Sequence, residues 1–285
     1  MACLTRQNIQ EFKTKGFTKV DVFWTTEELL AIKAALDSLK RSGKLNNVAT
    51  EDDGVTHTDH DKNLQLCPLM PEHPLFDSLP FVAKVGEAVS KLITEEDDES
   101  CCCYLSQTFW KPARQGLGTG WHQDNAYFQL SDGRKGTAMW TAVHDANINN
   151  GTLHVMAEMD EEVLPHTRDL TSDHHITCRE SIKEEDAVSL DVPAGGVVFF
   201  NCNVPHCTKA NQTDKARAAV AYHFVNMEVA RDRVFSLPEG AKYTTPVIVG
   251  AMADKEEVQT KQETWRQLVT AQCKDQSLEL GLAKG

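Results

Sequence analysis

The segment from Gly120 to Phe128 has the sequence GWHQDNAYF and places a histidine and an aspartate two residues apart. On a β-strand such residues share a face, so the side chains of His122 and Asp124 can converge on one metal ion. A third ligand must come from elsewhere, and His206 follows the apolar segment 196–200. Two histidines and one carboxylate make the facial triad of non-haem iron(II) sites. This triad leaves coordination positions for a bidentate 2-oxoacid and for dioxygen.

Arg217 lies 11 residues after His206, in a segment whose alternate residues from Ala218 to Phe224 are apolar. The strand pattern therefore predicts that Arg217 projects from the opposite face. A guanidinium inside a barrel needs an anion, and the distal carboxylate of 2-oxoglutarate would bind it through two hydrogen bonds. The Thr208 hydroxyl could donate to the same carboxylate. An H-x-D pair or a strand arginine is weak evidence for such a site when it occurs alone, so the prediction depends on their combination.

A resemblance to a known family covers most of the chain, from the helical start to about Asn226, and is strongest in four segments. They are QTFWKP at 107–112, WHQD at 121–124, WTA at 140–142 with NNG at 149–151, and VPHCT at 204–208 followed by NQT and Arg217. Together they resemble the phytanoyl-CoA dioxygenase family of iron- and 2-oxoglutarate-dependent oxygenases.

The resemblance implies a role for individual residues. By this likeness His122, Asp124 and His206 bind iron(II), and Arg217 with Thr208 holds the distal end of 2-oxoglutarate. Residues at the positions of Gln107 and Trp140 line the same cosubstrate pocket in relatives. No catalytic residue beyond the iron ligands is expected.

The activity implied is that of an Fe(II)- and 2-oxoglutarate-dependent dioxygenase that hydroxylates a small organic metabolite with O2, giving succinate and CO2. Asp124 argues against halogenation, because related halogenases have a small residue there. Where many relatives have a P-G-S-H segment, this chain has Leu153 to Met159, so the substrate cannot be carried over from them. We expect a small polar or zwitterionic substrate, and we predict that the segment His166–Arg179 faces it.

Two other classes of function stay open at this stage. One is a zinc-dependent hydrolase or isomerase on the same barrel, and the other is a non-catalytic binding module. Most of the other histidines are expected to be structural. His223 differs from them, since it shares the strand face of Arg217.

Helices are predicted on both sides of a β-rich centre. A capping box at Thr25–Glu28 starts a helix that ends near Gly43, and apolar residues at helical spacing predict others at 82–92 and 255–269. Strands are predicted near residues 102–111, 120–128, 137–145, 152–157, 186–192, 196–200 and 216–226. This pattern favours one domain over 1–285, with a helical part at 1–100, a jelly-roll core (a cupin-like double-stranded β-helix) at about 101–228 and a C-terminal extension at 229–285.

The composition limits the partners and the compartment. The net charge is −13, with 42 acidic and 29 basic residues, which disfavours nucleic acid as a partner. The first residues lack the pattern of a signal peptide, and no segment is apolar enough to span a membrane. The nine cysteines are an odd number and three are consecutive, which favours a reducing compartment. We therefore expect a cytoplasmic location, and the oligomeric state is not predicted.

Overall fold

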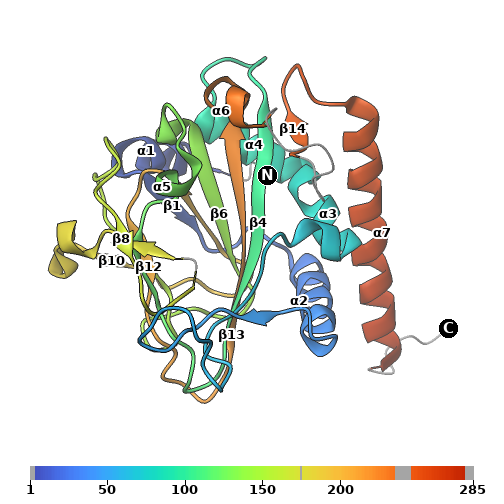
Figure 1. Cartoon of the computed structure of the whole chain (residues 1–285). Coiled ribbons are helices and arrows are strands. Elements are labelled where there is room, and N and C mark those ends of the chain that lie inside the picture. The colour runs from blue at the N-terminus through green and yellow to red at the C-terminus, as the bar shows by residue number, and fades with distance from the viewer. Residues whose placement is uncertain (1–3, 174, 235–244, 280–285) are drawn as a thin grey trace.

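Two β-sheets face each other in the computed structural model, and helices cover the outer face of the larger sheet (Figure 1). The structure describes residues 4–173, 175–234 and 245–279. The α-helices are α1 Arg6–Lys15, α2 Thr26–Arg41, α3 Pro74–Ser78, α4 Ala83–Ile93, α5 Asn125–Phe128, α6 Met227–Val234 and α7 Lys255–Glu279. The strands are β1 Phe17–Val20, β2 Asn46–Asn47, β3 Leu64–Leu66, β4 Cys101–Lys111, β5 Thr119–His122, β6 Gly136–Ala142, β7 Leu153–Val155, β8 Thr167–Arg168, β9 Ile176–Thr177, β10 Val188–Ser189, β11 Val197–Asn201, β12 His206–Thr208, β13 Arg217–Asn226 and β14 Val247–Val249.

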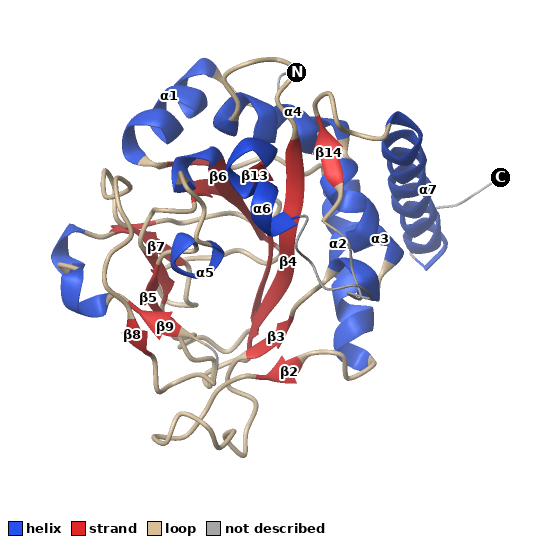
Figure 2. Ribbon diagram, turned by 45° about the horizontal axis from the view of Figure 1, so that its top comes forward, coloured by secondary structure: helices blue, strands red, loops and turns tan. Residues whose placement is uncertain are grey.

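The larger sheet has the order β1-β11-β6-β13-β4-β3-β2, with β14 also paired to β4, and the smaller sheet has the order β10-β7-β12-β5. The strand pairs within both sheets are antiparallel. Figure 2 shows the long strand β4 between the helices α2, α3 and α7 on one side and the smaller sheet on the other. The predicted jelly-roll core with flanking helices is confirmed.

Strand β13 lies between β4 and β6, and its two faces have different neighbours. Ala218, Val220, Tyr222 and Phe224 belong to the core that packs against the helices. Ala219 and Ala221 belong to the core between the two sheets, with Trp140, Leu153 and Phe200. The alternation of apolar residues therefore places Arg217 and His223 on the inner face, as the strand pattern predicts.

The first hundred residues contain three strands as well as helices, which the predicted helical part did not include. Helix α1 ends at Gly16, whose φ is +82°, and β1 follows at once and pairs with β11. A Cβ at Gly16 would lie 2.4 Å from the Val204 side chain, so this turn requires glycine. Such short strands have little pattern of their own, because the partner strand determines their position.

Two predicted element boundaries also differ from the structure. The C-terminal helix, predicted at 255–269, continues to Glu279 in α7. In the predicted strand 186–192, only β10 at Val188–Ser189 forms, and it pairs with β7.

Candidate metal and cosubstrate site

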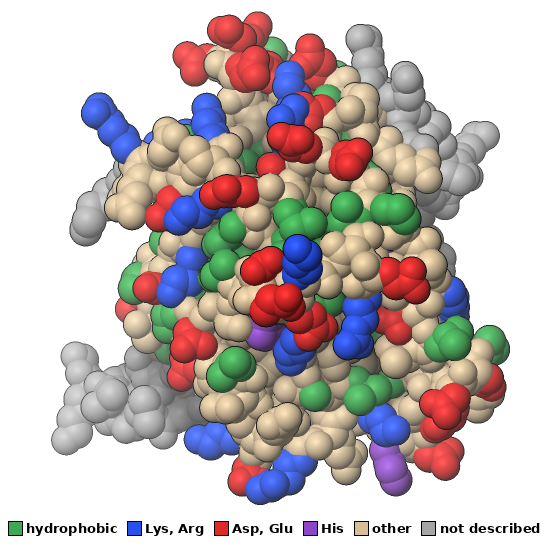
Figure 3. Space-filling model, turned by 90° about the vertical axis from the view of Figure 1, so that its left-hand side faces the viewer, with side chains coloured by type: hydrophobic (Ala, Val, Ile, Leu, Met, Phe, Trp, Pro, Cys, Tyr) green, Lys and Arg blue, Asp and Glu red, His purple; other side chains and the backbone are tan. Residues whose placement is uncertain are grey.

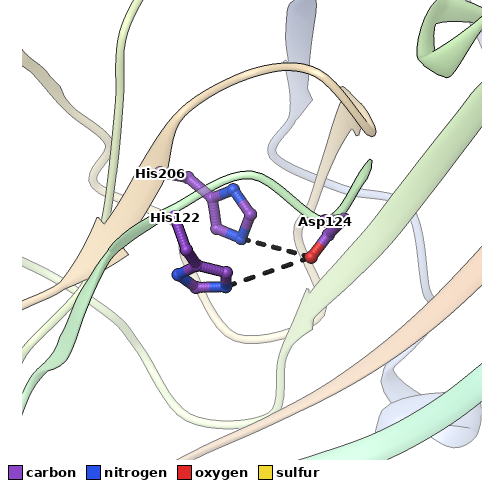
Figure 4. Close-up of side chains that lie close together, drawn as sticks. All are labelled: His122, Asp124 and His206. Carbon is purple, nitrogen blue, oxygen red and sulfur yellow. Dashed lines mark ion pairs between the residues drawn. The ribbon is translucent and has the colours of Figure 1, made fainter. Parts of the chain in front are cut away.

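Three side chains converge between the sheets at the adjoining ends of β5 and β12. His122 ends β5 and His206 begins β12, and the two residues are direct partners in the antiparallel pair. Their Nε2 atoms lie 3.9 Å and 3.7 Å from Oδ1 of Asp124. Figure 4 shows both rings directing this nitrogen at the same carboxylate oxygen. One potential ligand atom from each residue lies within 4.8 Å of the others.

The chain reaches this arrangement differently from the predicted strand 120–128, which is wrong beyond His122. Strand β5 ends there, and Asp124 has helical torsion angles, φ −59° and ψ −34°, immediately before α5. The Asp124 carbonyl accepts hydrogen bonds from the backbone N–H groups of Tyr127 and Phe128, both at 3.0 Å. A turn into a short helix, not the alternation of a strand, therefore directs the carboxylate toward the histidines.

Backbone carbonyls determine which nitrogen of each histidine is free. Nδ1 of His122 lies 2.8 Å from the Gly120 carbonyl oxygen, and Nδ1 of His206 lies 3.0 Å from that of Val204. Since a carbonyl can only accept, both Nδ1 atoms carry the hydrogen and both Nε2 lone pairs face Asp124. Burial lowers the pKa of His122 to about 3 and also lowers the pKa of His206. Both rings are therefore neutral at neutral pH, as metal ligands must be.

Asp124 is buried but remains ionised. Burial alone would raise the pKa of its carboxyl group, but the nearby histidines, His223 foremost, outweigh this effect and lower the pKa. Two neutral imidazoles and one carboxylate on one side of a site form the donor set of a non-haem iron(II) centre. The same donors could also bind zinc, so the surroundings must distinguish the two metals.

A cavity of about 410 Å³ adjoins the three side chains and is lined by them and by three of the predicted cosubstrate residues, Gln107, Trp140 and Thr208. Thr208 accepts a hydrogen bond from the Thr119 backbone N–H at 3.2 Å. Its hydroxyl hydrogen can then be donated to a ligand. The structure therefore brings together six of the seven residues that the sequence predicts for the site.

Arg217, the seventh, lies behind the cavity wall. Its guanidinium carbon is 5.7 Å from the centre of the Trp140 ring, and Nη2 donates to the Gly151 carbonyl oxygen at 2.6 Å. Arg217 is fully buried, and its Nε and Nη1 atoms have no hydrogen-bond partner among the described residues. Burial lowers the pKa of Arg217 to about 9, so the side chain is still charged at neutral pH. A buried cation with unused donors is suited to bind a carboxylate.

A second buried basic side chain, Lys111, is adjacent, and it was not predicted from the sequence. Lys111 pairs directly with Arg217 across β4 and β13 and is 1% exposed. Its Nζ donates to the carbonyl oxygens of Leu117 and Lys209. Burial, and then the charge of Arg217, lower the pKa of Lys111. Arg217 and Lys111 thus lie together at this end of the barrel, and the Lys-Pro end of the β4 pattern is the signal that could have indicated Lys111.

Residues from distant parts of the chain complete the cavity wall. Beyond the predicted residues, the lining consists of Asn46, Val48, Gln65, Cys67, Leu105, Phe109, Thr119, Tyr127, Phe128, Leu153, His175, Phe200, Cys207, Ala221 and His223. Asn46 and Gln65 were not predicted as site residues, because they lie on β2 and β3 in the part expected to be helical.

The segment His166–Arg179 contributes to this wall through His175. Its two arginines have other partners: Arg168 donates to the Gly54 carbonyl oxygen at 2.6 Å, and Arg179 lies 3.7 Å from the Glu184 carboxylate. Neither arginine lines the cavity.

Charges of both signs are interspersed on the face of the molecule beside the smaller sheet (Figure 3). The positive side chains visible there do not gather into a stripe of the kind that binds nucleic acid. Among the described residues, no helix combines the length and the apolar character needed to cross a membrane.

Comparisons with known proteins identify the family and agree with the fold. The model of the family "Phytanoyl-CoA dioxygenase (PhyH)" matches residues 12–219. The ectoine dioxygenase of Bordetella bronchiseptica is 21% identical over 245 residues, which cover 79% of this chain and 76% of that protein.

Two solved structures share the fold. One is EctD from S. alaskensis with 2-oxoglutarate and 5-hydroxyectoine, with a TM-score of 0.63 and 17% identity over 80% of this chain and 78% of that chain. The other is the epimerase SnoN with Fe3+, alpha ketoglutarate and nogalamycin RO, with a TM-score of 0.65 and 12% identity over 87% of this chain and 96% of that chain. The chain belongs to the phytanoyl-CoA dioxygenase (PhyH) family and is an Fe(II)- and 2-oxoglutarate-dependent dioxygenase.

Proposed function

We propose that His122, Asp124 and His206 bind the iron(II), and that Arg217 and Thr208 bind the distal carboxylate of 2-oxoglutarate. The observation that carries this proposal is the buried guanidinium of Arg217, with two unused donors, on the inner face of β13. The distal carboxylate of a dicarboxylate cosubstrate needs such a group, because a guanidinium can bind it through two parallel hydrogen bonds. Gln107 and Trp140 line the same cavity as the metal ligands and Thr208.

The protein's own contribution is orientation and exclusion of water. The carbonyls of Gly120 and Val204 hold the two imidazoles in the ligating tautomer. Trp140 and Phe200 supply apolar cavity wall beside the histidines, which strengthens the attraction between Arg217 and an anion.

We further propose that the reaction is hydroxylation of a small metabolite. Bound iron(II) and 2-oxoglutarate would supply the oxidising chemistry, in which one atom of dioxygen enters a C–H bond of the substrate, the other enters succinate, and CO2 is released. Succinate and the alcohol therefore form in equal amounts when turnover is coupled.

Anaerobic reconstitution with iron(II) and 2-oxoglutarate tests the metal and cosubstrate assignment. We expect a weak visible charge-transfer band that requires both components and disappears when zinc replaces iron. On admission of air, succinate should form. A protein that shows no band, consumes no oxygen and works with zinc alone would contradict the proposal.

For the substrate, we propose a molecule that is uncharged or cationic where it enters the cavity. No lysine or arginine lines the cavity in the described part of the chain, and its polar groups include the amides of Asn46 and Gln65. With Arg217 engaged by the cosubstrate, an anionic group of the substrate would lack a cationic side chain as partner, at a cost typical of buried unpaired charge. The proposed substrate class is therefore narrower than the polar or zwitterionic class that we expect from the sequence.

The approach to the cavity favours the same class. Segments 49–61 and 167–173 pair through an Ala49–Ser172 bridge, and they adjoin the lining residues Val48 and His175. Together these segments carry seven acidic residues and one arginine. Such a rim repels polyanions and attracts cations, most strongly at low ionic strength.

A matched panel of compounds can test this substrate class. Molecules that share one carbon skeleton and differ only in carrying a neutral amide, an amine, a carboxylate or a coenzyme A thioester would be added to the holoenzyme. We expect only the amide or amine members to stimulate succinate formation above the basal rate. Stimulation by the carboxylate or the thioester alone would contradict the proposed class.

A further inference from the structure

His223 contacts the second oxygen of the Asp124 carboxylate. Its Nε2 lies 3.2 Å from Oδ2, whereas Oδ1 of the same carboxylate faces His122 and His206. His223 is 2% exposed and lines the cavity. Because an ionised carboxylate only accepts hydrogen bonds, a hydrogen bond across this ion-pair contact would need the Nε2–H of His223 as its donor. Oδ2 has no other hydrogen-bond partner among the described residues. The two oxygens of Asp124 thus have separate partners.

An irregularity in the larger sheet lies beside this contact. His223 pairs with Leu105 on β4, but the next residue, Phe224, pairs with Cys103, so Tyr104 is an extra residue. Such a β-bulge changes the direction of neighbouring side chains and is common next to active sites. Here it lies at the position from which His223 reaches Asp124.

The ring of Phe128 packs against the ring of His223. The edge of one ring meets the face of the other at a centroid distance of 5.3 Å and an interplanar angle of 82°. Phe128 also packs against Tyr104, at 4.9 Å, and its backbone N–H donates to the Asp124 carbonyl at 3.0 Å. The bulge, the short helix α5 and the carboxylate are therefore one connected unit around His223.

We propose that His223 is a positioning residue that makes Asp124 a one-oxygen ligand of the iron. This inference rests on the proposed function. A hydrogen bond to Oδ2 withholds that oxygen and leaves Oδ1 for the metal. Without the donor, both oxygens could bind, and one of the positions that the cosubstrate and dioxygen need would be occupied.

Substitutions at His223 can distinguish the effect of its hydrogen-bond donor from the effect of its ring as a packing group. Replacement of His223 by phenylalanine keeps a ring against Phe128 but removes the donor. In His223→Gln the amide nitrogen can occupy the place of Nε2, whereas in His223→Asn the shorter amide cannot reach Asp124. His154→Phe is a control, because His154 is also buried and lies on β7, but it does not line the cavity.

The experiment measures cobalt(II) binding to each metal-free variant, the visible spectrum of the cobalt form, and 2-oxoglutarate affinity of the anaerobic iron form. For His223→Phe and His223→Asn we expect about 10- to 100-fold weaker binding of cobalt(II) and of 2-oxoglutarate, as is typical for partners of metal ligands. The visible spectrum of the cobalt form should also change in intensity. His223→Gln should bind within about threefold of wild type, because the donor is retained. His154→Phe should match wild type.

Each outcome bears on one proposal. Unchanged binding and spectra in His223→Phe, or equal impairment of the Gln and Asn variants, would overturn the positioning role. If the Phe variant does not fold, the comparison of Gln with Asn still decides. A wild-type protein that binds neither iron nor 2-oxoglutarate would instead refute the proposed function.

Discussion

Replacing Arg217 by methionine should weaken 2-oxoglutarate binding by about 30-fold or more, because loss of one partner of a buried charge pair costs about 2–5 kcal/mol. The same change should leave the unfolding free energy of the metal-free protein unchanged or higher. In that state the guanidinium is buried with two unused donors, which is itself destabilising. Anaerobic titration of the charge-transfer band and urea unfolding measure the two effects.

Two further variants test whether a loss of 2-oxoglutarate affinity is specific to the guanidinium of Arg217. Arg217→Lys keeps a charge but cannot form two parallel hydrogen bonds, so we expect an intermediate loss of about tenfold. Arg134→Met removes an exposed arginine that pairs with Asp132 and should bind 2-oxoglutarate as wild type does. Full affinity in Arg217→Met, or loss of affinity that only follows loss of folding, would count against the anion role.

Replacing Asp124 by alanine should raise the dissociation constant for iron(II) by more than about 100-fold, since changes to partners of ligands already cost 10- to 100-fold. Succinate formation should fall to background. The variant also leaves His223 without its acceptor in a buried site. Metal titration of the apo-protein and a succinate assay under air measure these effects.

The matched control is Asp132→Ala, at a carboxylate that accepts from the Arg134 backbone N–H at the surface. It should bind iron and form succinate as wild type does. If Asp124→Ala titrated with iron like the wild type, the carboxylate would not be a ligand.

Some features of the site follow from short stretches of sequence. His122 and Asp124 are close in the chain, so any local turn keeps them near each other. The face of Arg217 follows from the period of two along β13, because buried antiparallel strands alternate between two environments. Both features depend on local backbone geometry, and for that reason the iron chemistry could be predicted.

Elements with short local patterns could not be predicted from the sequence. The predicted strand 120–128 contains aromatic residues that favour strands. The chain nevertheless turns at Asp124 into α5, in which Phe128 packs against Tyr104 and His223. Strands β1, β2 and β3 were missed since their pairing depends on β11 and β4, which are distant in sequence. Tertiary partners override weak local preference in such cases.

The order H-x-D, distal histidine and arginine, together with the resemblance to a known family, thus sufficed to predict a metal, a cosubstrate and a reaction class. The division of the Asp124 oxygens between the metal side and His223, and the cation-free wall that includes Asn46, Gln65 and His175, could come only from the tertiary structure. Residues far apart in the chain supply these features, and their approach depends on sheet register, a bulge and packing. No local period in the sequence carries that information.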